Sequence, residues 1–504
     1  MKKLTITIPK IIFLIVSILI ILNVIWLKID TVPPYWDSAI HLGNINNYYS
    51  SLKSGQLMRF IGGYHFYPPL AYWISSLFFY VFGVSADIGV ISLSFFLVIL
   101  FTSAFLIGKD IQNEKLGLFF VLSLIGLPFL ISQTREYQLD FPLTAMVLLC
   151  IYLLFKSNFL KIKTYSYWFA IASGFAFLTK WTYFPFFAFM TIFAFIKAQK
   201  KDKKTVFDNI ILIFLITYFI AGWWYVKNFT YLKNDFIKNI QTGINEHDPS
   251  IFSMKSLLFY PLSLITMHLR LPLSILFFVC LWIIRRLKNN KVTFLLYLSL
   301  FYLITMILYV GKDHRFVEPI TPLLVFVIVF SFFNIKNHFY KKIALIILIA
   351  VSLVNFVTAT FYIKFLPQSI QLNLFNVTVP IYKNLGYTVG PPKRGDWHVE
   401  DIVDKYSSYK KILVVFSEDK MFFNHANFSY FGKLIAPKTE IKTVLFNQNQ
   451  IICSDLINFD IIVINDNPKR TPIIKKCCPE LGPFNLAETN FLLPDSSGVW
   501  IFKK

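Results

Sequence analysis

The sequence predicts a mainly α-helical protein with about 11–13 transmembrane helices, followed by a small C-terminal α/β domain. Apolar residues make up 56% of the 504 residues, charged residues 15%, and the mean hydropathy is +0.59. A soluble globular chain carries about 25% charged residues, and a membrane span needs about 20 mainly apolar ones. The composition therefore excludes a soluble enzyme, a disordered chain and a disulfide scaffold, and it indicates a polytopic membrane protein.

The formal net charge of +22 fits the same class. Membrane proteins gather Lys and Arg in their cytoplasmic loops. The basic runs of this chain lie between apolar stretches, so we expect no nucleic-acid partner.

The first apolar stretch, 11–27, follows Met1-Lys2-Lys3. A signal peptide is the alternative, but the stretch is long and no small-residue cleavage site follows it. We interpret it as the first span, with the N-terminus inside. Further spans are predicted at 88–107, 116–133, 139–156, 165–181, 183–197, 206–226, 270–287, 292–310, 318–335 and 342–362.

Five basic clusters set the orientation of these spans. Placing all of them inside gives a consistent path; they are 109–115, 156–163, 197–204, 285–291 and 336–342. Two apolar segments, 67–83 and 256–269, do not fit the parity of eleven spans. They lie flat at the outer surface or dip in and return, or both cross and make the count thirteen. Either count leaves the region after residue 363 outside.

The chain therefore divides into a transmembrane domain, 1–362, and an extracytoplasmic domain, 363–504. Strands are predicted at Lys411–Phe416, Phe459–Asn465 and Val499–Lys503, with helical or loop stretches between them. Nucleotide-binding glycine motifs are absent from the sequence. In an oxidising compartment, Cys453 can form a disulfide bridge with either Cys477 or Cys478.

The first outer loop, 28–66, contains a predicted helix with a polar stripe and an apolar stripe. Asp37, His41, Asn44 and Tyr48 recur at helical spacing, and an apolar stripe lies opposite. This pattern predicts an amphipathic helix on the membrane surface, its polar face turned to water or a substrate. The simpler interpretation of Asp37 is a helix cap.

Three more polar clusters fall on the predicted outer face. They are 65–73, with two prolines and an aromatic run; 135–142, with an Arg and two carboxylates; and 312–319, with Lys, Asp, His, Arg and Glu. Helix starts, caps and a surface salt bridge explain each cluster singly. Together they place cations and carboxylates at headgroup level, where a lipid-linked phosphate is met. Arg and Lys hold phosphate, and a carboxylate takes a proton from an attacking hydroxyl.

At these residues the chain resembles integral-membrane glycosyltransferases of the GT-C class, and most of all the group of protein O-mannosyltransferases and lipid A aminoarabinose transferases. Six segments match that family's motifs in order and cover roughly residues 30–325: Asp37 in WDSAIHL, Pro68 to Trp73, Arg135 with Asp140 to Leu143, Gly174 to Lys180, Trp224 to Asn228, and Arg315 to Pro322.

Two departures from the family's motifs narrow the choice of donor sugar. Ser38 follows Asp37 where many members have Glu, and Phe66 and Tyr67 replace the Glu-Lys pair of aminoarabinose transferases. Another cation must then hold the phosphate, or else His65 or Arg59 takes that place. These changes argue against aminoarabinose as the sugar and against a metal held by that Glu.

The resemblance implies the GT-C fold and a polyprenyl-phosphate sugar donor. Asp37 is the expected general base of an inverting transfer to a hydroxyl of an envelope glycan, lipid or protein. The residues expected to bind the donor phosphate or sugar are Arg135, Asp140, Lys180, Lys227, Arg315, His65, Tyr67 and His41. A divalent metal ion is an open option, with Asp37 and Asp140 as its ligands.

The rival hypothesis is a membrane transporter or lipid flippase for envelope precursors. Transporters place ionisable residues near the bilayer midplane, whereas the spans predicted here are almost free of charge at their centres. We therefore expect an enzyme in the bacterial plasma or inner membrane, with its site open to the outer face.

Overall fold

The structure is a computed structural model, and it describes most of the chain. The described residues are 7–63, 66–245, 247–361, 363, 366–372, 377–385, 389–416, 418, 420–445, 458–466 and 485–504. Cys453, Cys477 and Cys478 lie outside them, so the predicted bridge stays a prediction.

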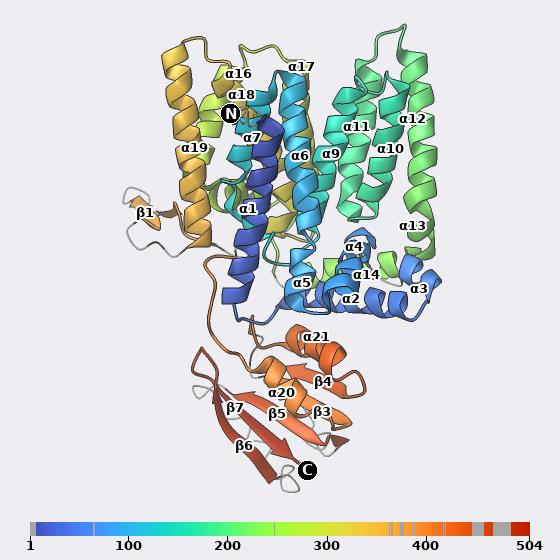
Figure 1. The fold of residues 1–504 in the computed structure, drawn as a ribbon, viewed down its shortest axis with the longest axis vertical. Helices are drawn as coiled ribbons and strands as arrows, with labels where there is room; N and C mark the ends of the chain where they lie inside the picture. The colour runs from blue at the N-terminus through green and yellow to red at the C-terminus, as the bar shows by residue number, and fades with distance from the viewer. Residues whose placement is uncertain are drawn as a thin grey trace, which may run out of the picture.

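A bundle of roughly parallel helices forms the larger part of the molecule (Figure 1). Each of the predicted spans overlaps one of them: α1 (Ile8–Ile29), α6 (Ser94–Ile111), α7 (Glu114–Leu124), α9 (Asp140–Lys156), α10 (Lys163–Phe177), α11 (Phe184–Lys197), α12 (Lys203–Thr217), α16 (Arg270–Ile284), α17 (Asn290–Ile307), α18 (Thr321–Phe333) and α19 (His338–Thr360). All residues of α18 are buried, so this helix lies in the core of the bundle.

Short elements extend several bundle helices. They are α5 (Ala86–Ile91), α8 (Pro128–Ser132), η1 (Trp181–Tyr183), η2 (Tyr218–Gly222), α13 (Trp223–Lys227) and η4 (His314–Ile320).

The number of membrane crossings predicted from the sequence stays a prediction. Among the described residues, 6 helices are long and apolar enough to cross a membrane, or up to 7 if one bent pair is counted as a span. The sequence predicts eleven to thirteen crossings.

The basic loops meet at one end of the bundle. Asp110, near the end of α6, binds Lys291 in the first turn of α17 at 2.5 Å and lies 3.6 Å from Lys156 at the end of α9. Lys161 binds Asp202 at 2.6 Å, which joins the α9–α10 loop to the α11–α12 loop. These ion pairs bring segments distant in sequence together, at the end of the bundle that the distribution of basic residues predicts to be cytoplasmic.

A layer of shorter helices covers the opposite end (Figure 1). It contains α2 (Trp36–Lys53), α3 (Leu57–Gly62), α4 (Leu70–Phe82), α14 (Phe229–Asn245), α15 (Met254–Ser263) and η3 (Leu264–His268). The segment Met254–His268 meets α16 at an angle of 114°. This segment and α4 correspond to the two apolar segments, 256–269 and 67–83, that do not fit the parity of the predicted spans.

Helix α2 differs from the amphipathic surface helix that the sequence predicts. His41 and Tyr48 of the predicted polar stripe are only 3% and 2% exposed, and Leu42 and Ile45 of the apolar stripe are fully buried. Both sides of α2 are covered because α4 packs on one side and helix α21 (His425–Ile435) of the C-terminal region on the other. The polar stripe therefore faces protein and a cavity rather than bulk water.

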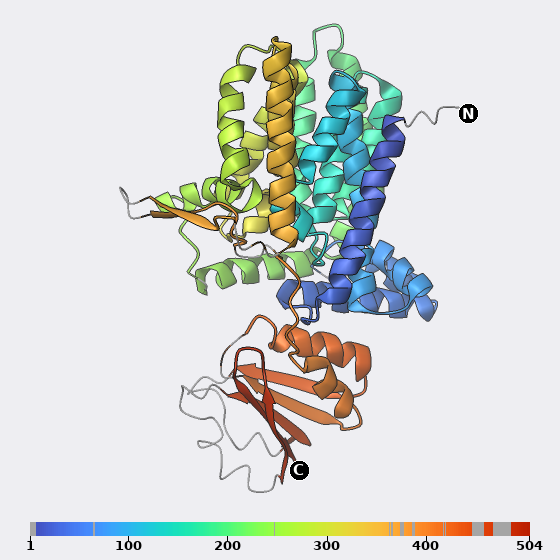
Figure 2. The ribbon, with the colours of Figure 1, turned by 60° about the vertical axis from the view of Figure 1, so that its left-hand side comes forward.

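The C-terminal region forms a small α/β unit beneath this layer (Figure 2). Its five-stranded sheet has the order β4-β3-β5-β7-β6. Strands β3 to β5 pair in parallel, and β7 pairs antiparallel with β5 and β6. The elements are β3 (Lys411–Phe416), β4 (Glu440–Leu445), β5 (Ile461–Asp466), β6 (Asn485–Leu492), β7 (Gly498–Lys503) and α20 (Val399–Lys405), preceded by a hairpin of β1 (Ser369–Leu372) and β2 (Val377–Pro380).

The three predicted strands correspond to β3, β5 and β7. The run KILVVF of β3 has five consecutive buried residues, as expected for a strand with neighbours on both sides in a sheet whose faces are covered. Helix α21 lies between the sheet and the bundle (Figure 1). The side chain of Asn427, near the start of α21, donates a hydrogen bond to the carbonyl of Pro34, so the C-terminal unit contacts the chain just before α2.

Candidate active site

A cavity of about 440 Å³ opens among the helix ends beside the layer of shorter helices. Its charged side chains come from the start of α2, the turn before α9 and its first residue, the turn after α10, the loop after α14 and the segment around the start of η4. Asn239, Thr242 and Gly243 of α14 form another wall, and His425 of α21 lies at its edge. The cavity is therefore bounded by the bundle, by an amphipathic helix and by the C-terminal unit.

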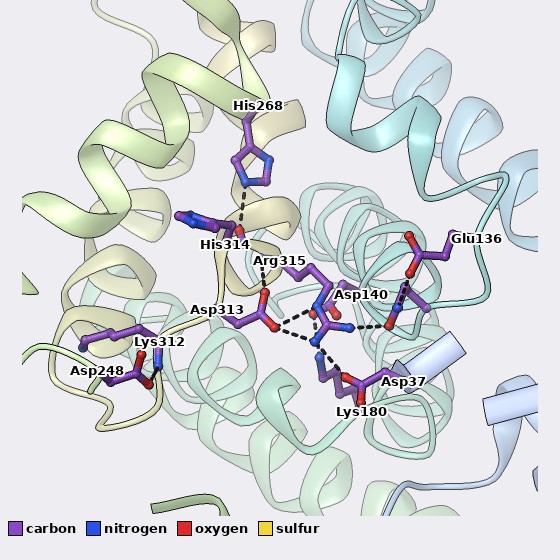
Figure 3. A network of polar contacts seen from close by, with 11 residues as sticks. Asp37, Glu136, Asp140, Lys180, Asp248, His268, Lys312, Asp313, His314 and Arg315 are labelled. Atoms are coloured by element: carbon purple, nitrogen blue, oxygen red, sulfur yellow. Dashed lines mark hydrogen bonds and ion pairs between the residues drawn. The ribbon is translucent and has the colours of Figure 1, made fainter. Parts of the chain in front are cut away.

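Asp37 and Arg315 line this cavity and form an ion pair (Figure 3). The Nη2 atom of Arg315 lies 2.8 Å from an oxygen of Asp37, and Asp313 accepts from Nε of Arg315 at 2.9 Å. The Arg315 side chain is 11% exposed, whereas that of Asp37 is 38% exposed. The carboxylate of Asp37 is thus held in place by a buried cation while part of it faces the cavity.

Two features of the local backbone lie next to the ion pair of Asp37 and Arg315. Trp36, the first residue of α2, has a φ of 39°, a value that a bulky L-residue rarely adopts. The Asp313 side chain accepts from the backbone N–H of Arg315 at 2.9 Å, which caps η4 and fixes the backbone of that arginine.

The charges around Asp37 keep it ionised. Burial raises the pKa of the Asp37 carboxyl, but the neighbouring positive charge, that of Arg315 above all, outweighs burial and lowers the pKa below its ordinary value. Burial lowers the pKa of His41 to about 3. His41 is therefore a neutral imidazole at physiological pH, with its Nδ1 atom 2.7 Å from the hydroxyl of Tyr72.

A second ion pair lies at the start of α9. The Nζ atom of Lys180 is 2.6 Å from Asp140, and their side chains are 7% and 2% exposed. The ammonium also lies 5.0 Å from the ring centre of Phe316. Glu318 is fully buried, and neither of its carboxyl oxygens has a hydrogen-bond partner among the described residues. It lies close enough to Asp140 and Lys180 to interact electrostatically with both. The buried ion pair is therefore that of Lys180 with Asp140, and Glu318 is a buried neighbour rather than a member of the pair.

A chain of hydrogen bonds leads away from Arg315. Gln138 accepts from Nη1 of Arg315 and donates to Glu136 at 2.6 Å. The hydroxyl of Tyr35 donates to the other oxygen of Glu136 at 2.9 Å. Burial raises the pKa of Glu136 to about 7, although both donors act to lower it. Glu136 therefore titrates near neutral pH.

The structure brings most of the sequence-predicted site residues to this cavity. Those that line it are Asp37, His41, Tyr67, Asp140, Lys180 and Arg315. Arg135 points elsewhere and is held by Asn23 and Thr360 at 3.0 Å each. Lys227 also does not line the cavity and extends toward Gly62 of α3. His65 lies outside the described residues.

Several residues of the cluster were not selected from sequence. Glu136, Gln138 and Asp313 lie in the same short polar segments as Arg135, Asp140 and Arg315. Sequence spacing marks such segments as polar, but it does not show which side chain of each turn faces the shared cavity.

The proposed metal ligands do not fit a divalent ion in this arrangement. Asp37 faces Arg315 and Asp140 faces Lys180, so each carboxylate already has a cationic partner. Among the described residues, a compact group of metal-ligand type occurs at Asp396, His398 and Asp401, and none of these lines the cavity.

Comparisons with known proteins agree with the resemblance seen in the sequence. A family model described as dolichyl-phosphate-mannose-protein mannosyltransferase matches residues 67–224. An uncharacterized protein of Aquifex aeolicus is 26% identical over 354 residues, which are 68% of this chain and 66% of that protein. The match thus spans just under two thirds of that relative.

Solved structures share the architecture along nearly the whole chain. ArnT from Cupriavidus metallidurans, in the apo state and bound to undecaprenyl phosphate, matches with a TM-score of 0.62 and 11% identity, covering 97% of both chains. The archaeal oligosaccharyltransferase AglB from Archaeoglobus fulgidus, in complex with an inhibitory peptide and a dolichol-phosphate, matches with a TM-score of 0.53 and 9% identity, covering 90% of this chain and 69% of AglB. The chain therefore has an ArnT-like fold.

Proposed function

We propose that this chain is a glycosyltransferase that moves a sugar from a polyprenyl phosphate to a hydroxyl group of a cell-envelope acceptor at the outer face of the membrane. The observation that carries the proposal is the partly exposed carboxylate of Asp37, held by the buried Arg315 in a cavity that also contains Lys180. The ArnT-like fold and the mannosyltransferase family match support the same reaction class.

The proposed reaction is a single displacement with inversion. Asp37 takes the proton from the acceptor hydroxyl, whose oxygen attacks the anomeric carbon. The bond from that carbon to the phosphate oxygen breaks, and polyprenyl phosphate leaves as an anion. A positioned base contributes about 10²–10⁴-fold to such a step.

Arg315 and Lys180 serve the leaving group. Both are buried cations with carboxylate partners, and a phosphate entering the cavity offers each a further anionic oxygen. Preorganised cations stabilise the charge that develops on a leaving phosphate. When Arg315 turns part of its charge toward phosphate, Asp37 loses some of its stabilisation and becomes a stronger base.

The location of the cavity supports an outer-face site. Residues of α2, α14 and α21 line it, and these helices lie at the end of the bundle opposite the basic loops (Figure 1). Cytoplasmic loops carry the excess of Lys and Arg. The donor would therefore be met at the outer headgroup level, in a bacterial plasma or inner membrane.

The test compares purified wild type with Asp37→Asn, using radiolabelled polyprenyl-phosphate sugars and an envelope extract as acceptor. We expect wild type to transfer the label and Asp37→Asn to lose at least about a hundredfold in rate. Asp208→Asn, an exposed carboxylate on α12 away from the cavity, is the control and should keep full activity. Full transfer by Asp37→Asn would remove Asp37 as base, and translocation without transfer would favour a flippase.

A further inference from the structure

The segment 31–36 links α1 to α2 and ends directly before the candidate base Asp37. The C-terminal unit contacts this segment along its length. The backbone N–H of its first residue donates to the carbonyl of Lys393 at 2.9 Å. Near its other end, the ring of Tyr35 packs edge to face against that of Phe422, with 5.3 Å between the ring centres. The chain that carries Asp37 therefore rests on the C-terminal unit.

A buried asparagine makes a further contact with the segment. Asn427, in the first turn of α21, is 0% exposed. Its Nδ2 atom donates to the carbonyl of Pro34, and its Oδ1 atom accepts from the backbone N–H of Asn424 at 2.7 Å. One side chain thus caps α21 with its acceptor and holds the backbone of Pro34 with its donor. The carbonyl of Pro34 lies only three residues before Asp37.

The backbone between Pro34 and Asp37 is strained. Trp36 has a φ of 39°, a region that bulky L-residues rarely occupy. A residue keeps such a conformation only where the structure around it over-determines it. On one side of Trp36, Asn427 holds the carbonyl of Pro34; on the other, Arg315 lies 2.8 Å from the carboxylate of Asp37. Release of the first contact would let Trp36 relax and would move Asp37.

The same segment also reaches Arg315 through side chains. The hydroxyl of Tyr35 donates to Glu136 at 2.9 Å. Gln138 donates to Glu136 at 2.6 Å and accepts from Arg315. A displacement of the segment would therefore act on both members of the ion pair, on Asp37 through the backbone and on Arg315 through these hydrogen bonds.

We propose that Asn427 is a positioning residue for Asp37, and that the C-terminal unit is thereby a working part of the active site. Asn427 holds the carbonyl of Pro34 in the place that keeps Asp37 paired with Arg315. It does not itself line the catalytic cavity, so it acts through the backbone and not by contact with a substrate. The inference rests on the proposed function, in which Asp37 is the base.

Asn427→Asp is the sharpest variant, because it removes the donor to Pro34 and keeps an oxygen that caps α21. A negative charge in the first turn of a helix is favourable, so α21 should persist. Asn465→Asp, in β5, is the matched control. Asn465 is also 0% exposed, and its Nδ2 atom donates to Ser497 at 3.1 Å and to the carbonyl of Gly498 at 3.2 Å, within the C-terminal unit. Both variants bury a carboxyl group, and only the first removes a contact with the segment.

The first measurement observes the segment directly and needs no substrate. The full chain is labelled with fluorotryptophan, placed in lipid nanodiscs and examined by fluorine NMR at pH 8, to keep the new carboxyl group ionised. The resonance of Trp36 is assigned by its loss in Trp36→Phe. We expect Asn427→Asp to shift or split this resonance and Asn465→Asp to leave it as in wild type. An unchanged resonance in Asn427→Asp, or the same change in both variants, would overturn the proposal.

The second measurement is the transfer assay. Misplacing a reacting group by about 1 Å can cost about a hundredfold in rate. We expect Asn427→Asp to lower kcat at least about tenfold and to leave the KM of donor and acceptor within about twofold, because the binding residues keep their places. Asn465→Asp should keep the kcat of wild type. An unchanged kcat in Asn427→Asp, a change confined to KM, or an equal loss in Asn465→Asp would each contradict a positioning role.

A second variant keeps the proposal testable if Asn427→Asp does not fold. Phe422→Leu removes the ring contact with Tyr35 and leaves Asn427 in place. It should change the Trp36 resonance and lower kcat in the same direction; no change in either would overturn the role of the C-terminal unit. If wild type transfers no sugar at all, the proposed function fails, while the fluorine spectrum still decides whether Asn427 positions the segment.

Discussion

The guanidinium of Arg315 lies 2.8 Å from the carboxylate of Asp37, although 278 positions separate them in the chain. Asp313 and Gln138 accept further hydrogen bonds of the same guanidinium. One cation thus joins the start of α2, the turn before α9 and the start of η4. The properties of the candidate base depend on that cation.

Replacing Arg315 should shift the pH dependence of transfer. A base must be ionised, so kcat/KM falls when the pH drops through the pKa of Asp37. The charge of Arg315 lowers that pKa; removing it in Arg315→Met lets burial raise the pKa, and the acid limb moves to higher pH. Arg315→Lys keeps the charge without the planar fork, so it should lose rate with a smaller shift. Identical acid limbs in wild type and Arg315→Met would contradict this role, as measured by pH–rate profiles.

The acid Glu136 should make stability depend on pH near neutrality. Its pKa in the folded protein is about 7, raised by burial from an ordinary value of 4.5. Above pH 4.5 the unfolded chain ionises first, so folding loses stability as the pH rises toward 7, by at most about 3 kcal/mol.

Glu136→Gln should remove that loss. We expect the variant to unfold at a higher temperature than wild type at pH 8 and at a similar temperature at pH 4.5, in thermal scans of detergent-solubilised protein. Glu114→Gln, whose side chain is 43% exposed at the opposite end of the bundle, should show no such pH dependence. A Glu136→Gln curve parallel to that of wild type would contradict the assignment.

The buried pair of Lys180 and Asp140 should respond unequally to its two single substitutions. Lys180→Met leaves the Asp140 carboxylate buried without its cation, and Asp140→Asn leaves the Lys180 ammonium without the carboxylate that lies 2.6 Å away. Breaking a buried pair costs about 3–5 kcal/mol, so we expect each single variant to unfold at a lower temperature than wild type, and by different amounts because the two charges differ in exposure. The double variant should recover part of the loss, because it leaves no unpaired buried charge; a loss equal to the sum of the two single losses would contradict a coupled pair.

Close packing of α6 and α7 should make Gly108 intolerant of a side chain. A Cβ atom there would lie 2.5 Å from the Cα of Gly117, a backbone atom that cannot move aside cheaply. Small residues let membrane helices approach closely, and overpacking typically costs about 1–3 kcal/mol. Gly108→Ala should therefore lower the unfolding temperature, whereas Gly43→Ala, whose nearest neighbour would be 3.9 Å away, should not. Equal unfolding temperatures for the two variants would contradict the tight contact.

Much of the architecture could be read from the chain because its signals are local. Apolar runs gave helices in every segment predicted to span the membrane, and continuous apolar runs gave strands such as β3. The burial of both stripes of α2 was not predicted, because the helix pattern does not show that α21, some 400 residues later, covers it; the position of α2 on the membrane surface stays a prediction.

The candidate site also has features that the sequence determines and features that only the tertiary structure decides. Sequence motifs and polarity alone selected Asp37, Asp140, Lys180 and Arg315, because charged residues at helix ends are visible in the chain. Only the tertiary structure decided that Arg315 pairs with Asp37, that Lys180 pairs with Asp140, and that Arg135 turns to a different cavity. Such pairings depend on which helix ends meet in space, and this is set by packing across hundreds of residues rather than by local spacing.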